Sequence, residues 1–394
     1  MTEKPLCPNC EVGEMSVFYE MRRVPVHSVL LLNTREEALN YPTGDIALGF
    51  CPACGFVSNV AFDPALHEYS ARYEATQGYS PTFNAFARRL AEDLVARHDL
   101  HGKDIIEIGC GQGEFLTLLC ELGGNRGIGF DPAYRGAPTA QVANNGQLTF
   151  IADFYGEQYT RSRSDFVCCR MTLEHIQPTA AFVRTVRRAI GESDAVVFFQ
   201  VPNAAYVLGE LAFWDVYYEH CSYFSPGSLA RLFRRCGFDV HRLWTDYDDQ
   251  YLMIEARPGN GRATAPLPEE DDLAALAQSV AHFSRQVPRR LAAWRQRLDG
   301  IRQTGQRAVI WGGGSKGVAF LTALNVRDEI EYVVDINPNK HGTFMAGTGQ
   351  EIVPPEFLKR YQPDVVVVMN PVYCREIQQD LDRMGVQAAL LAME

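Results

Sequence analysis

Short apolar runs and amphipathic stretches alternate along the chain between residues 101 and 258. Candidate strands, rich in β-branched and aromatic residues, lie at 104–108, 126–130, 148–151, 165–169, 195–200 and 251–256. Apolar residues recur at helical spacing over 113–122, 179–190 and 226–236. Alternation of this kind predicts an α/β domain with a mostly parallel, doubly wound sheet. A ligand would bind at the carboxyl ends of its strands.

The segment before this region, 66 to about 100, looks helical. Four apolar residues recur there at helical spacing: Phe83, Phe86, Leu90 and Leu94. We expect these side chains to pack against the following domain.

Beyond a plausible linker at 259–266, a long helical stretch runs from about 269 to 303. A second strand, Gly-rich turn and helix then begin at 308–317, with further candidate strands at 332–336 and 364–369. This pattern predicts another small α/β domain. The domain boundaries we expect are therefore 1–65, 66–258 and 259–394.

Composition narrows the possible partners. A length of 394 residues suggests two or three domains, and a net charge of −11 argues against nucleic acid and against an anionic membrane surface. The chain lacks an apolar run of the roughly 18 residues that a membrane helix requires, and its N-terminus lacks a secretory segment. We expect a cytoplasmic protein with a small-molecule substrate, as a monomer or homodimer.

Two Cys-Pro-x-Cys pairs stand out among the eleven cysteines, Cys7/Cys10 and Cys51/Cys54. Four thiolates at this spacing favour a closed tetrahedral Zn²⁺ site with a structural role. The alternatives are two disulfides or four unpaired structural thiols. The long insert between the pairs implies a hairpin, for which Val24–Leu32 supplies strand-like sequence.

The run Glu107-Ile-Gly-Cys-Gly-Gln-Gly113 joins a predicted strand to a predicted helix. Its glycines, Gly109, Gly111 and Gly113, allow a tight turn and leave room for a ligand against the backbone. About twenty residues on, Asp131 ends the next strand, where a carboxylate can accept hydrogen bonds from ribose hydroxyls. The run resembles motif I of the class I S-adenosylmethionine (SAM) methyltransferases. The alternative is a Gly-rich turn without a ligand.

That resemblance also indicates residues at the ends of later strands. Asp153 and Phe154 end the third strand, where such enzymes hold the adenine amine, and Arg170 ends the fourth, beside the methionine portion. His175 follows shortly, although a lone histidine at this position more often begins a helix than acts as a base.

The stretch Trp214–Pro226 concentrates Tyr217, Glu219 and His220 just before a predicted helix. A histidine titrates near neutrality and a neighbouring carboxylate can orient it, so His220 is a candidate general base. Tyrosine hydroxyls such as that of Tyr217 can donate to a developing oxyanion. An aromatic-rich loop that closes over the core is an equally good interpretation of these residues alone.

The second Gly-rich turn, with Gly312, Gly314 and Gly317, has G-x-G-x-x-G spacing, and Asp335 sits where a ribose-binding acid would sit. Taken by itself, it predicts a second nucleotide site. The alternative is a duplicated fold that keeps the turn and binds no cofactor.

Together these segments resemble the sugar C-methyltransferases over essentially the whole chain. Tyr217-Tyr-Glu-His-Cys-Ser-Tyr-Phe-Ser225 is similar to the family's diagnostic Tyr-His-Glu-His stretch, and Gly312–Gly317 with Asp335-x-Asn-Pro-x-Lys340 is similar to its C-terminal signature. The resemblance implies a zinc-binding N-terminal module with Cys7, Cys10, Cys51 and Cys54 as ligands. It also implies a central SAM-binding domain and a C-terminal Rossmann-like domain that lacks a dinucleotide and helps form the substrate cleft.

The same resemblance implies the reaction. His220 would remove the proton alpha to the ketone of a nucleotide-linked 4-keto-deoxysugar, Tyr217 and Glu219 would hold the sugar or steady the enolate oxygen, and the carbon would take the methyl group of SAM. An active-site tyrosine usually precedes the central domain in this family, and Tyr79, Tyr73 or neither can serve here. Tyr218 replaces the first histidine of the diagnostic stretch, a change we expect to fall in the substrate pocket.

Other functions stay open on this sequence. The protein could methylate oxygen or nitrogen of another small molecule. Less expected are a non-catalytic, zinc-bearing SAM-binding protein and a NAD-dependent oxidoreductase that uses the turn at 308–335.

Overall fold

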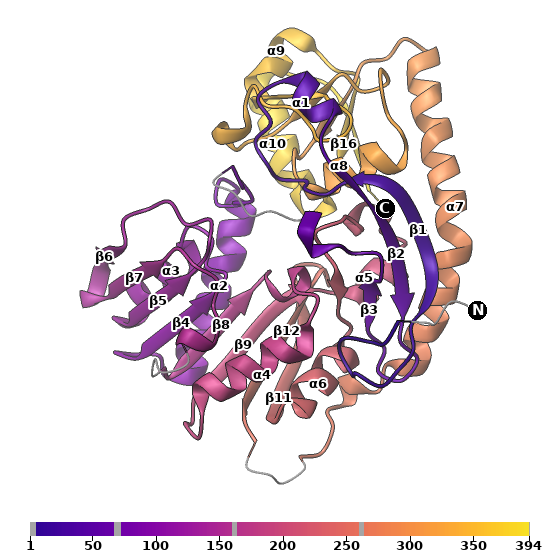
Figure 1. Cartoon of the computed structure of the whole chain (residues 1–394). Coiled ribbons are helices and arrows are strands. Elements are labelled where there is room, and N and C mark those ends of the chain that lie inside the picture. Colours follow the sequence, from indigo (N-terminus) through magenta and orange to yellow (C-terminus); the bar gives the residue numbers. More distant parts are fainter. Residues whose placement is uncertain (1–4, 67–71, 160–163, 260–263, 394) are drawn as a thin grey trace.

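The computed structural model describes residues 5–66, 72–159, 164–259 and 264–393. Within them the chain forms three sheets: a large central one, a small one built mainly from the N-terminal segment, and a third near the C-terminus. Figure 1 shows the central sheet and the C-terminal domain as separate lobes, with the N-terminal strands and the long helix α7 (Leu273–Gln303) running along one side of both.

The central sheet has the order β11-β12-β9-β8-β4-β5-β7-β6. Its strands are β4 (Asp104–Ile108), β5 (Arg126–Phe130), β6 (Thr139–Gln141), β7 (Gln147–Ile151), β8 (Phe166–Arg170), β9 (Val196–Pro202), β11 (Phe238–Asp246) and β12 (Tyr251–Pro258). Strands β7, β5, β4, β8 and β9 are parallel, and β12 pairs antiparallel with both β9 and β11. The predicted mostly parallel sheet is therefore confirmed. The edge strand β11 was not predicted from the sequence.

Helices cover this sheet close to where the apolar pattern predicts them. They are α2 (Pro81–His98), α3 (Glu114–Gly123), α4 (Thr179–Ile190), α5 (Ala204–Gly209) and α6 (Pro226–Arg235). Ser80 caps α2, with its hydroxyl accepting a hydrogen bond from the Phe83 N–H and Pro81 in the first turn. The prediction that residues 72–79 are helical is wrong, because they form turns and a single bridge to Leu30, while 67–71 of the same predicted stretch lie outside the described residues. Phe86, Leu90 and Leu94 are buried as expected, whereas Phe83 is half-buried.

The N-terminal sheet has the order β1-β2-β3-β10, with β1 (Ser16–Pro25), β2 (Thr43–Phe50), β3 (Val57–Asn59) and β10 (Ser222–Tyr223). The expected hairpin is present as β1 and β2, but the strand ends at Pro25. Val24–Leu32 is therefore mostly a buried loop, not the strand we expected, because it packs between domains instead of pairing. Strand β10 belongs to the 214–226 stretch, so that stretch is fixed directly to the N-terminal sheet.

The third sheet is entirely parallel, with the order β15-β14-β13-β16-β17. Its strands are β13 (Ala308–Trp311), β14 (Tyr332–Val334), β15 (Glu351–Val353), β16 (Val365–Val368) and β17 (Ala389–Ala392), with helices α8 (Ser315–Ala323), α9 (Leu358–Tyr361) and α10 (Cys374–Met384). The second α/β domain predicted from the sequence is confirmed. It follows α7 (Leu273–Gln303), while part of the predicted linker at 259–266 lies outside the described residues.

The N-terminal segment also reaches the C-terminal domain. Helix α1 (Arg35–Leu39) lies against that domain (Figure 1), where the Gly347 N–H donates to the Ala38 carbonyl at 2.8 Å and the Phe344 N–H to the Leu32 carbonyl at 2.9 Å. A single core joins β1 and β2 to α7 and to β13 and β16. In the part of the chain that the structure describes, none of the helices has the length and apolarity to span a membrane.

Candidate active site

The first Gly-rich turn connects β4 to α3 at the carboxyl end of the central sheet, as predicted. Gly109, Gly111 and Gly113 all have positive φ, at 71°, 57° and 88°. A side-chain carbon on Gly109 would lie 1.9 Å from the Thr172 hydroxyl oxygen. The turn thus needs glycine both for its backbone conformation and for its close approach to the chain after β8.

Asp131 lies next to this turn. Its carboxylate accepts hydrogen bonds from the Gly111 N–H at 2.9 Å and the Ala133 N–H at 2.8 Å, while burial raises its pKa above the ordinary value. Each oxygen keeps lone-pair capacity toward the cavity that Asp131 lines. These features fit the predicted hydrogen bonds from ribose hydroxyls.

The other predicted cofactor residues surround the same space. Asp153 accepts a hydrogen bond from the Tyr159 hydroxyl at 2.8 Å, and the Phe154 ring is 59% exposed although it lines the cavity. Arg170 stacks over the Phe115 ring, with 3.7 Å from the guanidinium carbon to the ring centroid, and donates to Gln200 at 2.8 Å. These two contacts hold the guanidinium at the cavity wall.

Glu107, at the end of β4, is 2% exposed, and one of its carboxylate oxygens has no hydrogen-bond partner among the described residues. Burial raises its pKa to about 8, against a smaller opposing effect of Arg170. The side chain is therefore mostly neutral near pH 7, ready to donate a hydrogen bond to a polar group in the cavity.

The stretch 214–226, called the His220 loop below, also lines the cavity. The imidazole of His220 is 5% exposed and packs on the ring of Tyr217, with 4.1 Å between ring centroids, and on the ring of His175 at 4.9 Å. Burial raises the pKa of Tyr217 well above its ordinary value, so its hydroxyl stays protonated and can donate. The predicted base and the predicted hydroxyl donor are thus in contact.

Glu219 joins three parts of the chain. Its Oε1 accepts hydrogen bonds from the Ser28 N–H at 2.9 Å and from the Ser28 hydroxyl, whose oxygen lies 2.7 Å from the hydroxyl oxygen of Ser315. Burial raises the pKa of Glu219 to about 7, despite these hydrogen bonds. One oxygen is thus committed to the N-terminal segment, and Oε2 has no partner among the described residues.

Tyr218 does not line the cavity, so our expectation for it is wrong. Its side chain is fully buried against Phe62, and its hydroxyl bonds to the backbone of Asp63. The loop therefore sends Tyr217, Glu219 and His220 into the cavity, whereas Tyr218 packs against the N-terminal segment.

The two candidate tyrosines of the preceding segment differ in setting. Tyr79 is 45% exposed at the edge of the cavity. Tyr73 is half-buried, and burial together with the charges of Glu219, Asp131 and Glu174 raises the pKa of its phenol well above the ordinary value. Tyr73 therefore lies between the Gly109–Gly113 turn that is expected to bind SAM (the SAM turn) and the His220 loop, a position that the sequence could not assign.

Sequence reasoning missed Glu174 and set His175 aside. Both lie just after β8, and one carboxylate oxygen of Glu174 lies within 4.8 Å of a ring nitrogen of His175 and of His220. His175 Nδ1 lies 3.0 Å from the Glu219 carbonyl oxygen, and burial lowers the pKa of its imidazole to about 4. The signal in the sequence was a carboxylate and a histidine adjacent at the carboxyl end of a strand.

The C-terminal turn closes the cavity opposite the SAM turn. Lys316, in the first turn of α8, pairs with Asp215 at 2.6 Å and donates to Gln250 at 3.3 Å. Asp335 accepts hydrogen bonds from the Gly313 N–H at 2.9 Å and from the Lys340 ammonium at 3.2 Å. Because Lys340 already neutralises the carboxylate where a dinucleotide ribose would bind, the turn is poorly suited to NAD.

One continuous cavity of about 1020 Å³ joins these groups. Its walls include the SAM turn, the His220 loop, the Tyr73–Ser80 segment and the C-terminal turn. Pockets for small molecules measure roughly 300–1,000 Å³, so this cavity lies at the upper end of that range.

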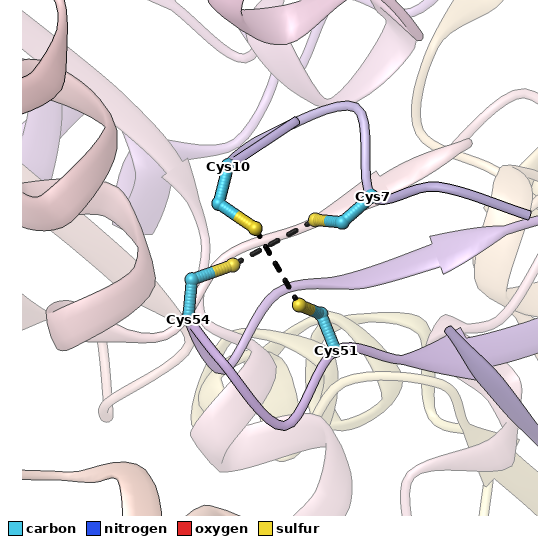
Figure 2. Close-up of side chains that lie close together, drawn as sticks. All are labelled: Cys7, Cys10, Cys51 and Cys54. Atoms are coloured by element: carbon cyan, nitrogen blue, oxygen red, sulfur yellow. Dashed lines mark hydrogen bonds between the residues drawn. The ribbon is translucent and has the colours of Figure 1, made fainter. Parts of the chain in front are cut away.

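The four cysteines of the N-terminal segment form a separate, buried group (Figure 2). The sulfurs of Cys7 and Cys54 are 3.7 Å apart, as are those of Cys10 and Cys51, and all four lie within 4.8 Å of one another. These separations exclude disulfides and match the roughly 3.8 Å between thiolates at a tetrahedral zinc ion with bonds of about 2.3 Å. A side-chain carbon on Gly13 would lie 2.4 Å from the Cys51 sulfur, so only glycine at this position leaves room for the four sulfurs.

Comparison with known proteins separates two regions of the chain. Residues 83–243 match a methyltransferase-domain family, and residues 257–391 match a C-methyltransferase C-terminal domain. The chain is 28% identical over 308 residues to the C-methyltransferase NovU of Streptomyces niveus, covering 74% of this chain and 72% of NovU. It is 27% identical over 169 residues to a ubiquinone biosynthesis O-methyltransferase of Neisseria meningitidis serogroup C, covering 38% of this chain and 69% of that enzyme. A solved structure of magnesium protoporphyrin IX methyltransferase from Synechocystis PCC 6803 is 15% identical and covers 45% of this chain and 84% of its own, with a TM-score of 0.34.

The methyltransferase-domain match, together with the Gly-rich turn and the strand order, defines the protein as a SAM-dependent methyltransferase of the class I fold. The second matched domain and the similarity to NovU are more specific. They support the sugar C-methyltransferase family that the motifs indicated.

Proposed function

We propose that this protein methylates the carbon alpha to the ketone of a nucleotide-linked 4-keto-deoxysugar, through an enolate formed by His220. The observation that carries the proposal is the single cavity into which the SAM turn, the His220 loop and the C-terminal turn all open. A methyl donor and a sugar linked to a nucleotide need a space of this size, with a base between them.

In this proposal Gly109–Gly113, Asp131 and Arg170 hold SAM, which when bound supplies the electrophilic methyl group. Asp153 and Phe154 line the region expected for its adenine. The protein then contributes orientation and charge stabilisation around the reacting carbon.

His220 takes the alpha proton of the substrate. Histidine in general titrates near neutrality, as a general base at this pH requires. The Tyr217 ring packed against the buried His220 imidazole fixes its orientation. The Tyr217 hydroxyl, or that of Tyr73 or Tyr79, donates to the enolate oxygen as charge develops there.

Glu219 holds the substrate through its one oxygen that has no partner among the described residues. Its other oxygen is bound by Ser28, which makes Glu219 a rigid part of the wall. Near pH 7 the carboxyl is about half protonated, so it can accept from a sugar hydroxyl or donate to one.

The C-terminal domain favours carbon over oxygen or nitrogen as the acceptor. It matches a C-methyltransferase domain over 257–391, whereas the similarity to the O-methyltransferase covers only 38% of this chain. We further propose that Cys7, Cys10, Cys51 and Cys54 hold a structural zinc ion, since their buried sulfurs have the spacing that a tetrahedral ion requires.

The function is tested by incubating the protein in D₂O with SAM and a panel of nucleotide-linked 4-keto-6-deoxysugars, followed by mass spectrometry and NMR. We expect one added methyl group bonded to carbon, and deuterium incorporation next to the ketone. A methyl group on oxygen or nitrogen, without deuterium incorporation, would contradict the proposal.

The base is tested with His220→Asn, which keeps the size of the ring roughly but cannot accept the proton. We expect turnover to fall by about 10²- to 10⁴-fold while SAM affinity is retained. His101→Asn, an exposed histidine far from the cavity, is the matched control. Full turnover in His220→Asn would exclude His220 as the base.

A further inference from the structure

Glu174 is a buried carboxyl group without an evident role in the proposed reaction. Its side chain is 1% exposed, and neither carboxylate oxygen has a hydrogen-bond partner among the described residues. Unpartnered buried carboxyl groups are rare, because desolvation of the group costs free energy that a hydrogen bond or a counter-charge normally offsets. The position of Glu174 therefore calls for a partner that forms during function.

Two imidazoles are candidates for that partner. A carboxylate oxygen of Glu174 and one ring nitrogen each of His175 and His220 lie within 4.8 Å of one another. This separation exceeds a hydrogen bond, but catalytic hydrogen bonds are often long in the ligand-free enzyme and shorten in the complex.

His175 is poorly suited to take up the charge. Its Nδ1 lies 3.0 Å from the Glu219 carbonyl oxygen, which selects the tautomer with the proton on Nδ1. Burial lowers its pKa to about 4, so it remains neutral. His220 is the imidazole that becomes charged if it takes a proton from substrate, and the Glu174 carboxylate lies within 4.8 Å as a counter-charge.

We propose that Glu174 is a positioning residue that shares a proton with His220 and raises the basicity of the imidazole during enolate formation. The inference rests on the proposed function, since it assigns a role in proton abstraction. In the reactive form both groups are deprotonated. His220 takes the alpha proton through one ring nitrogen, and the resulting imidazolium donates through the other to the Glu174 carboxylate.

The surrounding groups do not compete for this proton in the relevant pH range. Five thiols and phenols feel the charge of Glu174: Cys169 at β8, Cys221 and Tyr217 in the His220 loop, Tyr73 in the preceding segment and Tyr251 on β12. Burial raises the pKa of every one of them, to about 12 for Cys221 and Tyr251. Two other carboxyls that line the same cavity also titrate in this range and must be separated by mutation: Glu219, with a pKa raised to about 7, and Glu107, with a pKa raised to about 8.

Burial raises the pKa of Glu174 to about 8, so the pair holds a proton at neutral pH and loses it as the pH rises. Activity should therefore rise with pH, and the midpoint of this rise should lie above the ordinary pKa of a histidine. Glutamine at position 174 cannot hold the proton. In Glu174→Gln the midpoint of the rise should therefore shift to lower pH, toward the ordinary pKa of histidine, and the rate reached at high pH should be lower.

The experiment measures, with the full-length protein, the rate of deuterium incorporation into a nucleotide-linked 4-keto-6-deoxysugar without SAM as a function of pH. In Glu174→Gln we expect the midpoint of the rise to shift and the rate at high pH to fall about tenfold or more. In Glu219→Gln and in Glu107→Gln the midpoint should stay in place, whatever the rate. In parallel, ¹⁵N NMR of labelled histidines follows the His220 titration with no substrate present, with the signal assigned through His220→Asn. The titration should shift to lower pH in Glu174→Gln.

Three results would overturn the assignment. A His220 titration unchanged by Glu174→Gln would remove the coupling. Activity that falls instead of rising through this pH range would indicate that Glu174 acts in its protonated form, as a hydrogen-bond donor. Stoichiometric divalent metal lost in Glu174→Gln would make the cluster a metal site. Methylation at oxygen with no deuterium incorporation contradicts the proposed function instead, and the NMR titration still decides the role of Glu174.

Discussion

The phenol of Tyr218 is hydrogen-bonded to the backbone of Asp63. Its oxygen lies 2.8 Å from the Asp63 nitrogen and 3.2 Å from the Asp63 carbonyl oxygen, 155 residues away in the sequence. The ring also covers Gly44, where a side-chain carbon would lie 2.3 Å from it. The residue that departs from the family's diagnostic stretch thus fastens the His220 loop to the N-terminal sheet.

Replacing Tyr218 should therefore change stability rather than substrate choice. We expect Tyr218→Phe to lower the free energy of unfolding by about 1 kcal/mol, because it leaves the Asp63 groups without their partner. Denaturant unfolding measures this effect, and kcat and KM for the accepted sugar should stay within a factor of about two. A large change in KM with unchanged stability would return Tyr218 to the substrate pocket.

Gly109 should be intolerant of any side chain. In Gly109→Ala the methyl group meets the Thr172 hydroxyl and the residue must keep a positive φ, at a cost of about 1–3 kcal/mol. We expect the turn to shift and SAM affinity, measured by calorimetry, to fall roughly tenfold or more. Gly300→Ala, on α7 with open space around the position, is the control. Equal affinity in both variants would exclude the close approach at Gly109 as a requirement for SAM.

The four-cysteine group should contain about one zinc ion per chain, by metal analysis of the purified protein. We expect Cys7→Ser combined with Cys10→Ser to lose the metal and to lower the melting temperature, since the site closes the N-terminal segment. Cys374→Ser, on the half-exposed Cys374 of the C-terminal domain, should keep the metal. A metal content near zero with all four thiols reactive would refute the zinc site.

Buried carboxyl groups should make the ligand-free protein less stable as the pH rises. Glu107 has an ordinary pKa of 4.5 and a folded pKa of about 8, so between these values the folded state binds more protons than the unfolded state. The stabilisation is complete below about pH 4.5 and is lost as the pH rises to about 8, on the order of 1 kcal/mol or more for this group.

We therefore expect Glu107→Gln to flatten the decline in unfolding free energy over this range, measured by denaturant unfolding at several pH values. The exposed Glu269→Gln should leave the decline unchanged. A steeper decline in Glu107→Gln would show that the carboxyl is ionised in the folded protein.

Much of the fold was predictable because its signals are local. The turn from β4 to α3 needs glycines at fixed spacing, and β-branched runs such as Val365–Val368 specify buried parallel strands by themselves. The strand β11 was missed because it is an edge strand. Its pairing with β12 in a hairpin, rather than its apolar content, defines it.

The sequence by itself determined the chemistry that is available: a Gly-rich turn for SAM, four thiols at knuckle spacing, and His220 beside Glu219. Tertiary structure decided which side chains act together. Glu174 reaches His220 across 46 positions, Ser28 binds Glu219 across 191, and Tyr218 turns away from the cavity that Tyr217 enters. The reason is that side chains in irregular loops follow no period of 2.0 or 3.6, so their direction is set by the distant segments that pack against them.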